Sequence, residues 1–259
     1  MSLIKPFAGL RPVASRAGEV LAPPYDVLNS AEARAQAAGN PVSFLHVSKP
    51  EIDLPPDTDP YADAVYAQGA SNFRRLIESG ALQRDPGNYY YLYRLTMGEH
   101  VQTGIVAAAS VAAYDANTIR KHEFTRPKKE NDRVRHMEAL NAQTGPVFLV
   151  HREDAELTAL LRETLSTEPE IDAVAAGDVR HQLWVVREPA VIDGITHAME
   201  RLGVLYIADG HHRSAAASRV AAARNGADGA DYFLTVIFPH DQVQILDYNR
   251  VITDLNGLS

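Results

Sequence analysis

The chain has 259 residues, of which 46% are hydrophobic and 22% are charged. This length allows one large domain or two small ones, and such a chain buries a full core without covalent cross-links. It contains no cysteine, which excludes disulfides, a thiolate nucleophile and cysteine-bound metal. No stretch has the length of a membrane span, and the first ten residues lack the apolar core of a secretory signal. We therefore expect a soluble, cytoplasmic protein with no membrane partner.

The net charge of −8 is unevenly distributed along the chain. Residues 116–136 include seven basic and three acidic side chains, a net charge of +4, which leaves −12 for the remainder. Nonspecific nucleic-acid binding depends on neutralising many phosphates, and an acidic chain suits it poorly. A local basic segment on an acidic body favours a small anionic ligand, although a solvated loop rich in charge gives the same pattern.

The N-terminal half is predicted to contain two helices followed by two strands. Asn29 and Glu32 form a capping box for the first helix, which Gly39-Asn40-Pro41 ends. Asp59-Pro60 predicts the start of a second helix that ends at Gly80. Strands are expected over Tyr89–Leu95, which is rich in tyrosine, and over Val101–Ala113.

From residue 147 onward, strands and helices are mixed without strict alternation. One helix begins after Asp154, another ends at Gly203, and an alanine-rich helix runs from His211 to Arg224. This mixture favours a single α/β domain, residues 1–259, with a mixed sheet and flanking helices. The strands expected in this half are Val147–His151, Leu183–Val186, Val204–Ile207, Tyr232–Phe238 and Val243–Leu246.

The strand-to-helix junction Tyr206–Arg213 is the strongest candidate for a functional site. Gly210 allows a sharp turn and the close approach of a ligand. A helix start offers N–H groups and the positive end of the helix dipole, and Arg213 can hold a phosphate with two parallel hydrogen bonds. Asp209, at the end of the strand, could act as a base or hold a metal. The alternative is a structural turn in which Asp209 caps the helix and the two histidines are exposed.

Two further segments carry side chains suited to chemistry. Pro23-Pro24 fixes an extended backbone that presents the phenol of Tyr25 and the carboxylate of Asp26, although a structural turn explains the segment as simply. The basic segment combines residue types that bind metals, protons and phosphates, but it lacks the second histidine of a helical metal motif. A basic surface loop leading into a helix near Met137–Leu140 explains it at least as well. Its candidate residues are His122, Glu123, Thr125, Lys128, Asp132 and Arg133.

Taken together, the three segments resemble the bacterial family called domain of unknown function 1015, in order and approximate spacing, over residues 3–251. Members of that family usually continue further, so the resemblance implies that the chain is part of a longer protein. Ser214 stands where the family usually has an aromatic residue. The Asp-Gly-His-His-Arg turn also resembles the nucleotide-handling turn of the ParB/sulfiredoxin superfamily, which includes partition-protein domains, sulfiredoxin and free serine kinases.

The resemblance to serine kinases implies phosphoryl transfer from a nucleotide or pyrophosphate to a small hydroxyl substrate, possible acceptors including free L-serine. Such transfer requires cations around the phosphates and an aligned nucleophile, and Mg²⁺ is the expected cofactor. By this resemblance Asp209 and Glu123 are catalytic and are the candidate Mg²⁺ ligands. The phosphate-binding residues would be His211, His212, Arg213, His122, Lys128 and Arg133, and the substrate-binding residues Tyr25, Asp26, Thr125 and Asp132.

Two other functions stay open at this point. One is a ParB-like nucleotide-binding or DNA-associated module, against which the acidic charge and the lack of an identifiable helix-turn-helix both count. The other is a metal-dependent hydrolase built on His122, His211, His212 and Asp209, although adjacent histidines rarely bind one ion together. Assays of phosphate donors against small hydroxyl compounds separate a kinase from both alternatives.

Overall fold

The computed structural model describes residues 2–175, 177–247, 252, 254 and 256. In this part of the chain most strands join one sheet, and a separate antiparallel pair is formed by β2 (Leu10–Pro12) and β3 (Leu82–Arg84). The strands of the sheet are β1 (Ile4–Lys5), β4 (Tyr90–Met97), β5 (His100–Ser110), β6 (Ile119–Arg120), β7 (Val147–His151), β8 (Ile171–Val174), β9 (Arg180–Val186), β10 (Leu205–Asp209) and β11 (Tyr232–Pro239).

The sheet contains both parallel and antiparallel neighbours. Its order is β6-β10-β7-β11-β5-β4-β9-β8, with β1 paired to β5. Strand β10 is parallel to β6 and β11 is parallel to β7, whereas the remaining pairs are antiparallel. The prediction of an α/β fold with a mixed sheet is therefore confirmed.

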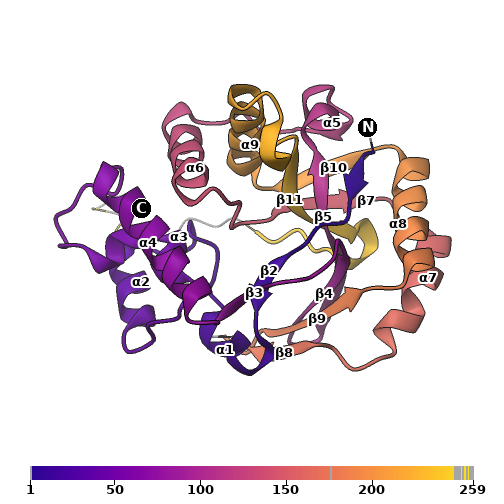
Figure 1. The fold of residues 1–259 in the computed structure, drawn as a ribbon, viewed down its shortest axis with the longest axis horizontal. Coiled ribbons are helices and arrows are strands. Elements are labelled where there is room, and N and C mark those ends of the chain that lie inside the picture. The colour runs from indigo at the N-terminus through magenta and orange to yellow at the C-terminus, as the bar shows by residue number, and fades with distance from the viewer. Residues whose placement is uncertain (1, 176, 248–251, 253, 255, 257–259) are drawn as a thin grey trace.

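Helices surround the sheet and also form a lobe beside it (Figure 1). Figure 1 shows α2, α3 and α4 at one end of the molecule, with α6 between this helical lobe and α9. The described helices are α1 (Ala17–Val20), α2 (Ser30–Ala37), α3 (Leu45–Ser48), α4 (Asp63–Glu78), α5 (Val111–Asp115), α6 (Pro127–Leu140), α7 (Ala155–Leu165), α8 (Pro189–Leu202) and α9 (His211–Ala223). None of them is long and apolar enough to cross a bilayer.

Capping residues set several helix ends as the sequence predicts. The side chain of Asn29 accepts from the Glu32 N–H (2.9 Å), and the Glu32 carboxylate accepts from the Asn29 N–H (2.8 Å), which completes the capping box of α2. Asp154 accepts from the Leu157 N–H (2.8 Å) at the start of α7. Gly203 closes α8 in the left-handed conformation, with φ 68°.

Three predicted elements are wrong in detail. Helix α4 begins at Asp63, because Asp59 accepts from the Tyr61 N–H (3.0 Å) in a turn of its own. The strand expected to reach Ala113 ends at Ser110, whose hydroxyl accepts from the Ala113 N–H (3.2 Å) and caps α5. Residues 243–246 have no regular structure instead of the expected strand, and two of their apolar side chains, Ile245 and Leu246, are exposed.

The main core lies between the sheet and the helices α7, α8 and α9, and smaller clusters hold the helical lobe together. Helix α6 packs against both α4 of the lobe and α9 of the main core. Its His136 is 3% exposed, and the ring Nε2 lies 2.8 Å from the carbonyl oxygen of Val47 in α3. The buried ring of His136 therefore links α6 to α3 of the helical lobe.

The protonation of His136 couples this junction to pH. Burial lowers the pKa of His136 to about 4, and the positive charge of Arg133 acts in the same direction. The folded protein thus favours the neutral ring, whose Nε2–H donates to the Val47 carbonyl. Its contribution to stability is complete above the unfolded-state pKa of about 6.5 and is lost as the pH falls from there toward 4.

We predict that the free energy of unfolding falls over this pH window and that His136→Gln, which keeps an N–H donor but cannot titrate, weakens that fall. Urea unfolding measured between about pH 7 and about pH 4 checks it. His197→Gln on the exposed side of α8 is the matched control and should retain the wild-type pH dependence. An equal pH dependence in wild type and His136→Gln would contradict the assignment.

Candidate functional site

Two strand-to-helix junctions lie next to each other in the structure. Leu205 and Tyr206 of β10 pair in parallel with Ile119 and Arg120 of β6. Because the carboxyl ends of parallel strands meet at the same edge of a sheet, loop 121–126 after β6 lies beside the turn after β10. His122 and Glu123 therefore lie close to the Asp209–Arg213 turn, as the resemblance to serine kinases implies.

The two adjacent histidines connect these junctions directly. His211 Nε2 accepts from the His122 N–H at 3.4 Å, and His212 Nε2 accepts from the Arg126 N–H at 3.0 Å. The rings of His122 and His211 meet edge to face, with centroids 4.4 Å apart. Loop 121–126 is thus fixed near both ends to the first turn of α9.

His211 is buried, and its ring is engaged on both sides. Only 4% of it is exposed, and its Nδ1 lies 3.6 Å from a carboxylate oxygen of Glu123. Burial lowers the pKa of His211, and the nearby ring of His122 acts in the same direction. A neutral ring whose Nε2 accepts a backbone N–H carries its proton on Nδ1, where it faces Glu123.

The Arg213 side chain bonds to groups on both sides of the turn after β10. It forms an ion pair with Asp209 and donates to the carbonyl oxygen of Pro146. The Arg213 side chain is 12% exposed, whereas that of Asp209 is 66% exposed, so the carboxylate faces solvent and the guanidinium lies behind it. The interpretation of Asp209 as the helix cap is wrong, because Gly210 occupies the cap position and no side chain caps α9.

Gly210 is required in this turn for two reasons. Its φ of +98° belongs to the left-handed region that side chains rarely adopt. A Cβ added there would lie 3.1 Å from Nε of Arg213. The absence of a side chain therefore lets the guanidinium fold back over the turn and reach Asp209.

The N-terminal segment also reaches this region. The guanidinium of Arg133 in α6 lies 3.9 Å from the centre of the Tyr25 ring. Burial raises the pKa of Tyr25, and the positive charges of Arg133 and Arg213 act against this rise. The phenol of Tyr25 is thus within electrostatic reach of arginines on both α6 and α9. Asp26, the neighbouring carboxylate, is exposed.

From Pro127 onward the basic segment is helix instead of the loop considered from sequence. Pro127 stands in the first turn of α6, where its missing N–H costs nothing. Asp132 accepts from the Tyr66 hydroxyl (2.7 Å) and pairs with Arg133 (2.6 Å), so both charges are fixed. Lys128, on the exposed surface, lies 4.2 Å from the centre of the Tyr61 ring.

Sequence reasoning missed Glu130, which links the loop to both helices. Its carboxylate accepts from the Thr125 hydroxyl (2.7 Å) and from Arg219 of α9 (2.9 Å). Although burial raises the pKa of Glu130, these two hydrogen bonds lower it overall. The five-residue spacing of Thr125 and Glu130 across a helix start was the available sequence indication, but Arg219 lies 89 residues away.

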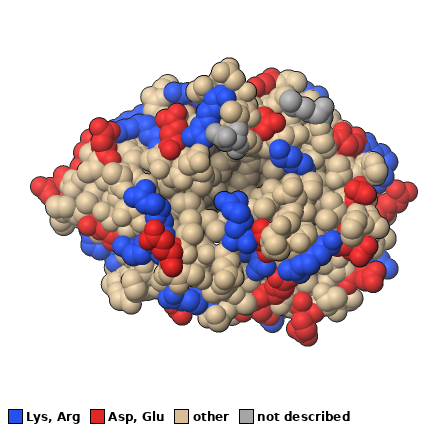
Figure 2. Space-filling model, in the orientation of Figure 1, with Lys and Arg blue, Asp and Glu red and all other residues tan. Residues whose placement is uncertain are grey.

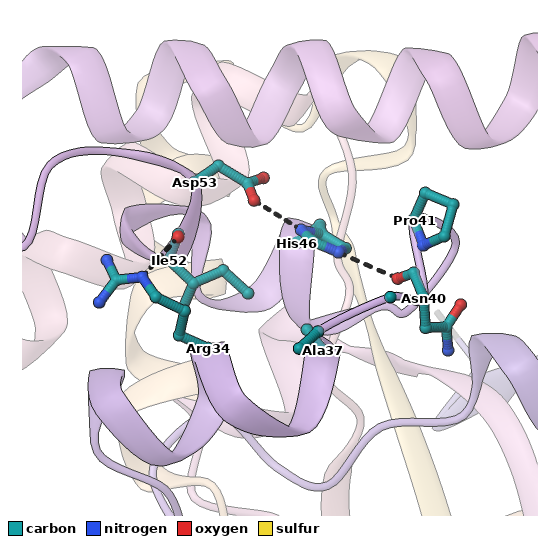
Figure 3. A pocket seen from close by; sticks show the side chains of 9 residues that line it. Arg34, Ala37, Asn40, Pro41, His46, Ile52 and Asp53 are labelled. Atoms are coloured by element: carbon teal, nitrogen blue, oxygen red, sulfur yellow. Dashed lines mark hydrogen bonds and ion pairs between the residues drawn. The ribbon is translucent and has the colours of Figure 1, made fainter.

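One face of the molecule has a hollow bordered by basic side chains. The face shown in Figure 2 is hollowed near its middle, and Lys and Arg side chains stand around the hollow. A different cavity, of about 380 Å³, lies in the helical lobe. There His46 bridges Asp53 (2.8 Å) and the Asn40 carbonyl (3.1 Å), and Arg34 donates to the Ile52 carbonyl (2.9 Å) (Figure 3). Those polar groups bind one another, and no sequence motif falls there.

Few side chains near the turn could act as ligands for the expected Mg²⁺. In the described part of the chain, no group of three or more His, Cys, Asp or Glu side chains is arranged to hold a metal ion. Asp209 and Glu123, with 66% and 59% of their side chains exposed, offer two carboxylates near the turn. Mg²⁺ is commonly held by one or two carboxylates together with phosphate oxygens. Asp209 is also paired with Arg213, so Mg²⁺ binding by these two carboxylates stays a prediction.

We predict that Gly210→Ala destabilises the protein more than Gly39→Ala does. Both glycines have positive φ, so both variants bear the left-handed strain of about 1–2 kcal/mol, but only Gly210 also meets the Arg213 guanidinium. Gly39 has open space around its Cβ position. Thermal unfolding midpoints of the two variants check this, and equal losses would show that Arg213 moves aside freely.

Comparison with known proteins identifies a family. No curated protein matches the sequence, and no solved structure matches it. The family model described as Protein of unknown function (DUF1015) matches residues 4–259. Because that match spans nearly the whole sequence, the chain belongs to this family.

Proposed function

We propose that the protein is a cytoplasmic phosphotransferase that moves a phosphoryl group from an anionic donor to the hydroxyl group of a small molecule, with free L-serine as a candidate acceptor. The observation that carries this proposal is the meeting of three segments at the start of α9. They bring two arginines, an exposed carboxylate and a helix N-terminus together. The resemblance of the turn to that of serine kinases in the ParB/sulfiredoxin superfamily also supports it.

The turn offers several positive groups to a phosphate. The N–H groups of Arg213 and Ser214 bond to the Gly210 carbonyl, and helix geometry gives the preceding N–H groups of His211 and His212 no partner within α9. Arg213 and Arg133 are each held in place by an aspartate, and an anion would bind beside these ion pairs. Oriented cations around the phosphates are the main requirement of phosphoryl transfer.

The residues divide into binding and positioning roles. The rings of His211 and His212 hold loop 121–126, so we assign them to positioning, and we assign phosphate binding to Arg213, Arg133 and Lys128. His122, which is exposed at the same edge, completes the binding group. Tyr25, Asp26, Thr125 and Asp132 remain the proposed substrate side.

Asp209 is the proposed base. Its carboxylate is exposed at the end of β10, where an acceptor hydroxyl could approach and transfer its proton. Glu123 lies on the neighbouring loop, against His211. Mg²⁺ bound by these two carboxylates and the phosphate oxygens would neutralise charge on the transferred group.

The alternatives differ in measurable ways. A ParB-like nucleotide-binding module would use the same positive groups but would show binding without turnover. A metal-dependent hydrolase would need ring nitrogens of His211 and His212 as ligands, and their Nε2 atoms already accept backbone N–H groups in this structure. A panel of ATP, ADP and pyrophosphate against small hydroxyl compounds, with product detected by mass spectrometry, separates the kinase from both.

We predict that Asp209→Asn and Arg213→Ala fail in different ways. Asp209→Asn removes the base and should lower turnover about 100- to 10,000-fold, while donor affinity is unchanged or higher because a negative charge is lost. Arg213→Ala removes a charged contact and should weaken donor binding by about 1.5–3 kcal/mol. Donor affinity, turnover and thermal midpoint are measured for both variants.

Asp172→Asn and Arg180→Ala are the matched controls. These residues form an aspartate–arginine pair on β8 and β9, and its loss should change neither affinity nor turnover. If Asp209→Asn and Arg213→Ala both lowered stability but kept wild-type turnover per folded molecule, the turn would be structural and the proposal would fail.

A further inference from the structure

Phe124 is a solvent-exposed aromatic side chain at the candidate site. It is 99% exposed, although burial of such a side chain would contribute about 1.5–3 kcal/mol. Met97 and Val101, which are also exposed, flank the turn between β4 and β5. Phe124 differs from them because it lies in loop 121–126, beside the start of α9.

The backbone on both sides of Phe124 is held in place. Two residues before it, the His122 N–H bonds to His211, and two residues after it, the Arg126 N–H bonds to His212. Its neighbour Glu123 has a carboxylate oxygen 3.6 Å from His211 Nδ1. The ring is therefore presented from an anchored loop at the edge of the site.

The segment that carries Phe124 is positively charged overall. Residues 116–136 carry a net charge of +4, and α9 begins immediately beside the loop. An aromatic face next to positive groups recognises a nucleotide in two parts, because the base stacks on the ring and the phosphates bind the cations. Inorganic pyrophosphate has no part that would contact an aromatic face.

We propose that Phe124 is the stacking surface for the base of a nucleotide whose phosphates lie at the Arg213 turn, so that the phosphoryl donor is a nucleotide and not inorganic pyrophosphate. This inference rests on the proposed function, because it requires the turn to bind phosphates. Stacking tolerates any base, and it contributes about 5- to 150-fold in affinity.

The test compares ATP, CTP and GTP with inorganic tripolyphosphate, which has the same phosphate chain and no base. Calorimetric titration of wild type should give at least one nucleotide an affinity about 5- to 150-fold above that of tripolyphosphate. Phe124→Ala should remove this difference and leave tripolyphosphate affinity unchanged. Because the side chain is fully exposed, the variant should fold normally. Met97→Ala, at an exposed apolar residue on another turn, should behave as wild type.

A second variant, Phe124→Trp, reports on base stacking through its fluorescence. The sequence has one tryptophan, Trp184, which is 3% exposed, so Phe124→Trp adds a fluorophore whose emission the bound base should quench. Tripolyphosphate should bind this variant without quenching it. Equal affinity for nucleotides and tripolyphosphate in wild type, unaffected by Phe124→Ala, would overturn the stacking role and leave the phosphate site intact. Failure of wild type to bind any of these ligands would overturn both proposals.

Discussion

The parallel pairing of β6 with β10 is the constraint on which the candidate site depends. It involves only Ile119 and Arg120 on one strand and Leu205 and Tyr206 on the other. Yet it brings the loop after the first strand to the turn after the second, and the helices α6 and α9 follow from those points and pack together. This pairing therefore sets the basic segment beside the Tyr206–Arg213 junction.

The site is then held by hydrogen bonds between side chains and backbone across the two junctions. Histidine rings accept loop N–H groups, Arg213 joins Asp209 to the Pro146 carbonyl, and Glu130 joins Thr125 to Arg219. Each tie fixes a polar or charged group before any ligand arrives. Fixed groups lose less entropy on binding, and oriented charges stabilise a charged transition state more effectively than mobile ones.

Local capping and apolar patterns predicted much of the fold, because they depend on neighbouring residues. Asn29 and Glu32, Asp154 and Gly203 each mark a helix end through contacts within a few residues. The central strand Val147–His151 was predicted with its observed bounds. By contrast, the two-residue strand β6 has no pattern of its own, since its identity comes from β10, about 85 residues later.

The same difference between local and long-range contacts explains which features of the site were predicted from sequence and which were missed. The resemblance to serine kinases implied that His122, Glu123 and the Asp209–Arg213 turn form one site, and the structure brings them together. Sequence could not show that the histidine rings accept backbone N–H groups, because that depends on which loop folds beside them. Residues 243–246 show the converse: apolar composition predicted a strand, but in the described structure they pair with no strand.

The most direct test of the account is whether phosphate binds at the start of α9. Amide and arginine side-chain NMR signals are followed while inorganic pyrophosphate is titrated into the protein. Binding at this turn should shift the amide signals of His211 and His212 and the Nε–H signal of Arg213 together, with one common affinity. Saturation without shifts at these three groups, or shifts confined to the helical lobe around Arg34 and His46, would contradict the central claim.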